Sequence, residues 1–397
     1  MYSGRLTAHN LFRLRVVEDD FDLNKIQCDI PHRSQRAALL REACLIIFDE
    51  ITMTHRNNLR AIDEVLRKVR NEPNEPFGGV VFLCAGDFRQ ILPIVKNGTR
   101  ADTVDATIKN SPLWNEFKLH ELTTPVRQQY DVEFSLFIDS IANGTCPSTP
   151  EGKVTMHLIR AVTNEDEWIN FIYPNLHQGE ASTTNQALLS VLNHDVDTIN
   201  SKIATSLPNQ FTSLYSHDRL NESSEISEFF KNNMTEEFFN NVNFPNVPPH
   251  ELRLKVGMEC FLVRNLSPDE GLLNNTQVTV DGITRYLLQV RVKDKKKVFY
   301  LPRISFAMNL QRKGIKLTRK QFPLRAGYVK TINRAQGSTL QKAGIDLRKD
   351  CFAHGQLAVA LSRVRNRNDI LILTTPGKQD ENKNAVTTNV VYHEVLL

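Results

Sequence analysis

The stretch LIIFDEITM, Leu45–Met53, runs from an apolar tetrapeptide directly into two adjacent carboxylates, Asp49 and Glu50. A continuous apolar run is typical of a parallel strand that is covered on both faces. Ligand sites in open parallel sheets lie just beyond the carboxyl ends of the strands, which is where these two acids stand. One carboxylate there can hold Mg²⁺ while the other orients an attacking water. The alternative is a solvated strand end or a helix cap.

The residues that follow this stretch predict an open parallel sheet. A second apolar run covers Val80–Ala85. Between the two runs, apolar residues recur at the steps of three and four that mark an amphipathic helix, at Leu59, Ile62, Leu66 and Val69. The order strand, helix, strand is that of a parallel α/β sheet, in which the strand ends meet at one edge.

Polar groups also follow the second strand, which leads into GDFRQILP at residues 86–93. A glutamine can donate to a phosphate oxygen and accept from a water, which makes Gln90 a candidate sensor of a terminal phosphate. Asp87 stands three residues before it. The alternative is a turn that Asp87 stabilises and Pro93 closes.

The α/β pattern continues downstream with one interruption. The apolar run Ala187–Leu192 predicts another strand, and the polar residues 206–250 predict a surface excursion with a few helical turns. Between 259 and 306 the pattern changes to short alternating segments that predict β-hairpins, at Gln277–Val280, Tyr286–Val292 and Val298–Leu301. Residues 322–397 return to α/β and end in the strand Ile370–Leu373. We therefore predict two α/β lobes with a β insert.

Charge is distributed unevenly along the chain. The 397 residues carry a net charge of +4, but residues 285–342 hold 16 Lys and Arg against one acid, Asp294, which leaves 33 bases and 44 acids in the rest. One basic segment in an otherwise acidic protein indicates a polyanion partner. The alternative is a solvated hairpin with lysine-rich edges.

The composition argues against several classes of protein. No apolar run is long enough to span a bilayer, and the first twenty residues lack an apolar signal core, so we expect neither a membrane protein nor a secretory peptide. The six cysteines are scattered without a Cys-x-x-Cys pair, which favours a reducing compartment and no zinc site.

Two later segments carry groups that suit phosphates. In TINRAQGSTL, residues 331–340, backbone amides near Gly337 suit contacts to a phosphate backbone. HGQLAVALSRVRN, residues 354–366, predicts a helix that brings Arg363 and Arg365 after an apolar face. An arginine in that place can reach across a cleft to a γ-phosphate. The alternative is a surface arginine on an ordinary amphipathic helix.

Taken together, these segments resemble the petite-integration-frequency (Pif) family of superfamily-one DNA helicases. The matching segments follow one another in the family's order: Thr7–Phe12, Leu45–Met53, Gly86–Ile94, Glu121–Gln128, Leu254–Leu266, Phe322–Leu340 and His354–Ile370. The resemblance implies two RecA-like lobes, with an SH3-like β insert in the second. On this basis we expect the first lobe at 1–125, the first part of the second lobe at 126–258, the insert at 259–320 and the rest of the second lobe at 321–397.

The resemblance also implies an activity. Proteins of this family use ATP and Mg²⁺ to translocate along single-stranded DNA from five-prime to three-prime and to unwind forked duplexes. The implied roles are DNA repair, recombination or telomere maintenance, with a nuclear or mitochondrial location.

Individual roles carry over by motif. The resemblance implies that Asp49 holds Mg²⁺, Glu50 serves the attacking water and Gln90 senses the γ-phosphate. The further nucleotide-site residues that it implies are Arg127 and Arg363, offered by the second lobe, together with Asp87, Gln336 and Gly337. DNA contacts are expected at His9, Ser338 and Thr339 from the resemblance, and at Arg334, Lys295, Lys296 and Lys297 from the basic segment.

One family motif, the phosphate-binding loop G-x-x-x-x-G-K-S/T, does not occur in these 397 residues. Its amides and lysine neutralise phosphate charge, and loss of one such donor typically lowers a rate by a factor of about 10² to 10³. We therefore expect an N-terminally truncated family member that cannot hydrolyse ATP alone. Two alternatives are a non-catalytic DNA-binding remnant of a mobile-element helicase and a nucleotide-dependent enzyme of another kind.

Overall fold

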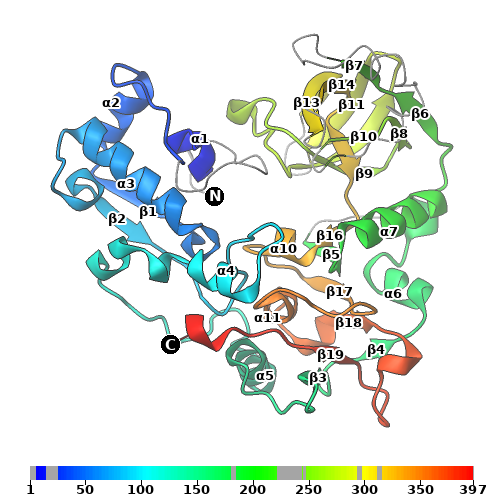
Figure 1. Ribbon diagram of the computed structural model, residues 1–397. Helices are drawn as coiled ribbons and strands as arrows, with labels where there is room; N and C mark the ends of the chain where they lie inside the picture. Colours follow the sequence, from blue (N-terminus) through cyan, green and yellow to red (C-terminus); the bar gives the residue numbers. More distant parts are fainter. Residues whose placement is uncertain are drawn as a thin grey trace.

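The computed structural model describes residues 6–14, 26–179, 185–220, 244, 247–292, 297–310 and 315–396. Figure 1 shows an N-terminal α/β unit at the left, a parallel sheet below it to the right and a group of antiparallel strands at the top right. We call the first unit lobe 1, the parallel sheet with its helices lobe 2, and the antiparallel group the insert.

Lobe 1 is built on two parallel strands, β1 (Leu45–Phe48) and β2 (Val81–Cys84), with Leu45 opposite Val81. The predicted helix between them is confirmed as α3 (Arg56–Arg70), and all four of the apolar positions that predicted it are buried. It begins where the His55 side chain accepts from the Asn57 amide and ends at Asn71 in the left-handed region. The shorter helices of this lobe are α1 (Ala8–Phe12), α2 (Gln35–Glu42) and α4 (Arg100–Asp105).

The prediction that these strands are covered on both faces is wrong for the described residues. Side chains alternate between the faces of a strand, and here one face packs on α3 while the other is open. Ile46 is 8% exposed, whereas its neighbour Ile47 is 64% exposed. The open face carries Leu45, Ile47, Val81 and Leu83.

Lobe 2 is a five-stranded parallel sheet in the order β16-β5-β17-β18-β4. The predicted strands near 187 and 370 are confirmed as β5 and β18. The five strands are β4 (Ala161–Val162), β5 (Gln186–Ser190), β16 (Val329–Thr331), β17 (Lys342–Asp346) and β18 (Ile370–Leu373).

Helices pack on the sheet of lobe 2 and form two separate apolar cores with it. One core contains residues of α6 (Glu165–Ile172) and α7 (Asn193–Ser206). The other contains residues of α5 (Val132–Asn143), α10 (Ile332–Ala335) and α11 (Gln356–Leu361). Near the C-terminus, β19 (Val386–Thr388) pairs with β3 (Lys153–Thr155). This sheet is therefore covered on both faces, as its continuous apolar strands predict.

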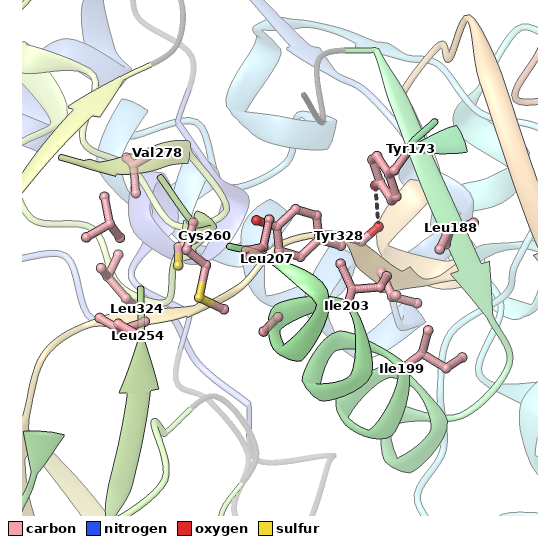
Figure 2. Packing of buried hydrophobic residues seen from close by; sticks show 14 of the residues in the cluster. Tyr173, Leu188, Ile199, Ile203, Leu207, Leu254, Cys260, Val278, Leu324 and Tyr328 are labelled. Atoms are coloured by element: carbon pink, nitrogen blue, oxygen red, sulfur yellow. Dashed lines mark hydrogen bonds between the residues drawn. The ribbon is translucent and has the colours of Figure 1, made fainter. Parts of the chain in front are cut away.

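The insert is antiparallel. Its largest sheet has the order β12-β11-β10-β9-β15, and the predicted hairpin segments lie in β10, β11 and β12. The strands are β9 (Glu259–Leu262), β10 (Gln277–Ile283), β11 (Leu287–Val292), β12 (Val298–Pro302) and β15 (Leu324–Ala326). Figure 2 shows how this sheet joins lobe 2, because Tyr328 packs between Cys260 and Leu207 on one side and Tyr173 on the other.

The predicted polar excursion, 206–250, contains two strands in its described part. They are β6 (Thr212–Tyr215), which pairs with β8 (Glu251–Leu254), and β7 (His217–Leu220). β7 pairs with β14 (Ile315–Gln321), which also pairs with β13 (Ile304–Leu310). Residues 221–243 lie outside the described part of the chain, so the predicted helical turns there stay a prediction.

Candidate nucleotide site between the two lobes

The two carboxylates lie at the carboxyl end of β1. Glu50 adopts a left-handed conformation with φ 55° and ψ 39°, and its amide donates to Asp49 Oδ1 over 3.1 Å. Such a backbone is uncommon for a glutamate and persists only where the surroundings fix it. Here the next amide, from Ile51, donates to the Ala85 carbonyl at the end of β2 over 2.9 Å. The turn is therefore fixed both by the Asp49 carboxylate and by the end of β2.

Glu50 is held by lobe 2. The side-chain amide of Gln336 donates to Glu50 Oε2 over 2.9 Å. Gly337, at φ +75°, follows it so closely that a Cβ added there would lie 3.7 Å from Glu50 Oε1. The end of α10 thus lies directly on the carboxylate, and the predicted residues Glu50, Gln336 and Gly337 come together.

Gln90 lies on the loop after β2, which is braced by ion pairs. Arg89 pairs with Asp87 over 3.0 Å on its own loop and with Asp139 of α5 over 3.2 Å. Gln90 faces a pocket of about 180 Å³ between the lobes. Its lining brings together Asp87, Gln90, Arg127 and Arg363, which the sequence had marked as candidates, with neighbours that include Arg89, Gln128 and Asp139.

Two amide oxygens at this site have no hydrogen-bond partner among the described residues. They are Gln90 Oε1 and Gln336 Oε1, and both atoms are buried. A buried acceptor without a donor carries a free-energy penalty of about 1–3 kcal/mol, so each oxygen suits a donor that a ligand or a water supplies. The Glu50 carboxylate beside Gln336 adds a third acceptor to this region.

Arg127 is attached to lobe 2, although the chain reaches it directly from lobe 1. Its guanidinium donates to Thr339 Oγ1 over 3.2 Å and to the Ser362 carbonyl over 2.8 Å. The next residue, Gln128, is buried and donates to the Ser362 and Val364 carbonyls. Burial lowers the pKa of Arg127, the charge of Arg365 adds to this effect, and Glu50 opposes it.

Arg363 follows α11 and is only 2% exposed. It donates to the Val359 carbonyl over 2.8 Å, to the Ser338 carbonyl over 3.2 Å and to Ser362 Oγ over 2.7 Å. Burial and the charge of Arg127 lower its pKa to about 10, while Glu50 acts in the opposite direction. Arg127 and Arg363 therefore share one wall, and Glu50 is the acid whose charge acts on both. Two neighbouring cations favour an anion between them.

Sequence reasoning missed Gln128, Arg89 and Asp139 as supports of this pocket. Arg89 and Gln128 are each adjacent in sequence to a predicted residue, but no pattern distinguishes a residue that lines a site from one that supports it. Asp139 gives no signal, because it is one acid on an ordinary amphipathic helix.

A second pocket, of about 120 Å³, lies between lobe 2 and the insert and is basic. We call it the junction pocket. Its cations are Arg325, Lys330 and Arg334. Its other lining residues are Val196, Phe261, Val263, Asn274, Asn275, Ala326 and Val329.

The cations of the junction pocket have neighbours within the protein. Arg325 pairs with Asp197 over 2.8 Å, and Lys330 lies 5.2 Å from the centre of the Phe261 ring. Burial lowers the pKa of Arg334, the charge of Arg325 adds to this, and Asp197 opposes it. Three cations that line one pocket suit a phosphate. Arg334 stands two residues before Gln336, so α10 lies between this pocket and Glu50.

The other predicted DNA contacts are spread over the molecule. His9 is exposed on α1, the Ser338 hydroxyl donates to the Ala335 carbonyl over 2.5 Å, and Thr339 accepts from Arg127. Lys297 pairs with Glu270 over 2.5 Å. Lys295 and Lys296 lie outside the described residues. Part of the basic segment is therefore neutralised within the protein.

The donor set for Mg²⁺ at this site is small. Within the described ranges, no group of three or more His, Cys, Asp or Glu side chains is arranged to hold a metal. Asp49 is one exposed carboxylate next to Glu50. This fits an ion that reaches the site with a phosphate ligand, as Mg²⁺ does in nucleotide enzymes. Asp49 as its ligand stays a prediction.

Comparison with known proteins identifies the family. The family model for PIF1-like helicases matches residues 1–152, and the model described as "DNA helicase Pif1, 2B domain" matches residues 237–283. The ATP-dependent DNA helicase PIF6 of Trypanosoma brucei brucei is 26% identical over 93% of this chain and 45% of its own length. The chain belongs to the Pif1-like helicase family.

Other Pif1 proteins show the same relationship. Human PIF1 is 26% identical over 83% of this chain and 46% of its own length, and Pif1 of Bdellovibrio bacteriovorus is 25% identical over 93% and 74%. The chain thus spans a little under half of the length of the Trypanosoma and human proteins.

Solved Pif1 structures share the fold. A Bacteroides Pif1 bound to single-stranded DNA has a TM-score of 0.66 and 23% identity, covering 93% of this chain and 79% of that one. Pif1 of Candida albicans has a TM-score of 0.60 and 21% identity, covering 92% and 78%. The predicted RecA-like α/β fold is confirmed, whereas the SH3-like character of the insert stays a prediction. No helix in the described part of the chain is long and apolar enough to cross a membrane.

Proposed function

We propose that this chain binds single-stranded DNA and forms two walls of an ATP site, as a Pif1-like DNA helicase module. The observation that carries the proposal is the meeting of sequence-distant groups between the lobes. Gln90 of lobe 1 shares a pocket with Arg127 and Arg363, and Glu50 accepts from Gln336. This pairing of acid and amide with arginines is what phosphoryl transfer requires.

We assign a separate role at the nucleotide to each group of residues. Glu50 orients a water, and the unpartnered oxygens of Gln90 and Gln336 accept from it or from the nucleotide. Arg127 and Arg363 offset negative charge from the opposite wall. Mg²⁺, with Asp49 as the proposed ligand, would neutralise phosphate charge when it is bound with ATP.

The expected rate of ATP hydrolysis depends on the phosphate-binding loop. Its motif is absent from these 397 residues, and so are the amides and the lysine that it contributes. We therefore propose that the 397-residue chain by itself hydrolyses ATP poorly or not at all. Unwinding of forked DNA and translocation from five-prime to three-prime are proposed for the module together with such a loop.

The junction pocket is the proposed contact with the DNA backbone. Arg325, Lys330 and Arg334 gather there beside an aromatic ring and two asparagines, a combination that suits single strands. One of the similar structures, the Bacteroides Pif1, is described as bound to single-stranded DNA. From the family alone we infer a role in DNA repair, recombination or telomere maintenance, in the nucleus or mitochondria.

A second function, DNA binding without catalysis, is favoured by the missing loop motif. On that reading the chain is a remnant of a mobile-element helicase that retains its basic surface. The two proposals differ in their requirement for Glu50. A helicase needs this carboxylate for ATP hydrolysis, whereas a protein that only binds DNA does not.

Binding and hydrolysis together test the proposal. Fluorescence anisotropy with labelled single-stranded and duplex oligonucleotides over a salt series is expected to show tighter, salt-sensitive binding of the single strand. DNA-stimulated ATP hydrolysis is expected to be absent or very slow. Rapid hydrolysis by the purified chain that is lost in Glu50→Gln contradicts the proposed inactivity. Equal affinity for both DNA forms, or none, contradicts the proposed partner.

A further inference from the structure

His354 joins lobe 1 to the C-terminal segment of the chain. It lies just before α11 and is 2% exposed. Its Nε2 lies 2.7 Å from the carbonyl oxygen of Phe88, on the loop between β2 and Gln90. Its Nδ1 accepts from the Tyr392 amide over 2.8 Å. Because Nδ1 accepts a hydrogen bond, the proton of the neutral ring is on Nε2, which donates to Phe88.

The next residue brings the two backbones into contact. Gly355 has φ +69°, and a Cβ added there would lie 2.4 Å from the Arg89 carbonyl oxygen and 2.7 Å from the Gln90 carbonyl carbon. Only glycine tolerates both the conformation and the approach. The peptide of Gln90 is therefore packed directly on the residue that begins the arginine-bearing segment of lobe 2.

The C-terminal segment 389–395, which we call the strap, contacts both Gly355 of lobe 2 and α4 of lobe 1. The Val390 carbonyl accepts from the Gly355 amide over 3.1 Å. Glu394 pairs with Arg100 of α4 over 2.6 Å, and the Arg100 guanidinium lies 4.8 Å from the centre of the Tyr392 ring. In Figure 1 the red C-terminal segment runs past α5 toward α4, so it connects lobe 2 to lobe 1.

We propose that His354 is a positioning residue that keeps Gln90 opposite Arg363, by binding the Gln90 loop and the strap through the two nitrogens of one neutral ring. The role of Gln90 at the nucleotide rests on the proposed function, whereas the positioning does not. His354 does not line the nucleotide pocket, so it acts on the site through the loop and not by contact with a ligand.

Protonation separates the two bonds. The imidazolium has two donors and no acceptor, so it keeps the bond to Phe88 and loses the one from Tyr392. Burial lowers the pKa of His354, Asp87 and the Phe88 carbonyl oppose this, and Arg100 and His393 add to it. The neutral ring's contribution is therefore complete above the ordinary histidine pKa of about 6.5 and declines as the pH falls below it.

Two variants test the bonds separately. In His354→Asn the side-chain oxygen takes the place of Nδ1, so the strap bond is kept and the Phe88 bond is lost. In His354→Gln the amide takes the place of Nε2, so the Phe88 bond is kept and the strap bond is lost. The readout is hydrogen–deuterium exchange of the full chain in peptides covering 86–92 and 389–396, with rates corrected for intrinsic exchange.

The expected result is a split pattern. His354→Asn speeds exchange at 86–92 by about 3- to 10-fold, the effect of one lost hydrogen bond, and shifts the NMR signal of the Gln90 side-chain amide. His354→Gln speeds exchange at 389–396 and leaves the Gln90 signal in place. In the wild type, acid speeds the strap alone once the pH falls through the lowered pKa of His354, which lies below the ordinary histidine value of about 6.5, and His354→Asn removes this dependence.

Two results would overturn the proposal. One is equal acceleration of both segments by both variants, which indicates packing without the paired bonds. The other is an unchanged Gln90 signal in His354→Asn. Failure of the proposed function, seen as no binding of single-stranded DNA, leaves these measurements unaffected, so the two failures are distinguishable.

Discussion

Gln336 Nε2 lies 2.9 Å from Glu50 Oε2, although the two residues are 286 positions apart in the chain. The bond joins the end of α10 in lobe 2 to the carboxylate that follows β1 in lobe 1. Two residues before Gln336, Arg334 lines the basic junction pocket. One short segment therefore contacts the proposed DNA site with one side chain and the proposed catalytic acid with another.

Replacement of Gln336 by leucine tests this link. Gln336→Leu removes the donor from Glu50, so the left-handed turn loses a support and the amides of residues 50–54 exchange faster. A hydrogen bond to a charged group predicts an acceleration of about tenfold. Hydrogen exchange measures it, with Gln341→Leu, at an exposed glutamine on the same segment, as the matched control. Equal rates in the two variants contradict the link.

The junction pocket predicts a specific salt dependence. Lys330→Ala is expected to weaken single-stranded DNA binding and to reduce the slope of log K against log salt by about 0.7, the value for one phosphate contact on a single strand. The control is Arg291→Ala, which removes a basic-segment residue that does not line the junction pocket and that pairs with Asp281 over 2.7 Å. Anisotropy titrations at several salt concentrations measure both slopes, and identical slopes would rule out a phosphate contact at Lys330.

The buried ion pair between Arg319 and Asp218 predicts a large loss of stability. Both side chains are almost inaccessible, at 0% and 6% exposed, and their closest approach is 2.7 Å. Removal of one partner leaves the other charge buried, which typically costs about 3–5 kcal/mol. Arg319→Met is therefore expected to lower the unfolding midpoint strongly, and Arg291→Ala only slightly. A small effect of Arg319→Met would show that water reaches Asp218.

Asp131 lies four residues after Arg127 in the chain, and its ion pair with Arg367 is expected to be acid-sensitive. Arg367 donates to the Asp131 carboxylate over 2.6 Å, and this bond is the main reason that the pKa of Asp131 is lowered. A lowered carboxyl pKa stabilises the fold above the unfolded value of about 3.9, and the contribution is lost as the pH falls below it. Asp131→Asn keeps the helix cap but not the charge.

The unfolding midpoint of Asp131→Asn should therefore lie below that of the wild type at neutral pH and converge with it in acid. Urea unfolding at a series of pH values measures the difference. A gap between the two proteins that stays constant down to strongly acidic pH would mean that the ionised carboxylate of Asp131 contributes nothing.

The sequence predicted where strands and helices lie, but it did not predict which of their side chains are exposed or paired. The runs near 45, 187 and 370 are strands and 56–70 is a helix, because apolar periodicity reports local structure directly. The exposed face at Ile47 was not predicted, because the identity of an apolar residue does not show whether another element packs on it. Arg319, counted toward a polyanion surface, is instead paired with Asp218 inside the insert.

For the site, the sequence likewise predicted individual residues but not the contacts between them. Asp87, Gln90, Arg127 and Arg363 were marked as candidates, and the structure brings them into one pocket. The family resemblance implied that Gln336 belongs to the nucleotide site, but its bond to Glu50 was not predicted, because no local pattern encodes a contact between segments so distant in sequence. His354 gave no signal of its own, since its two partners are backbone groups from different parts of the chain.

The central claim is that the two lobes form one nucleotide site, and side-chain NMR during a titration with MgATP tests it most directly. The account predicts that the Gln90 amide signal from lobe 1 and the Arg363 guanidinium signal from lobe 2 shift together with a single Kd, while Arg291 stays unchanged. Shifts on one lobe alone, or on neither at millimolar MgATP, would contradict it.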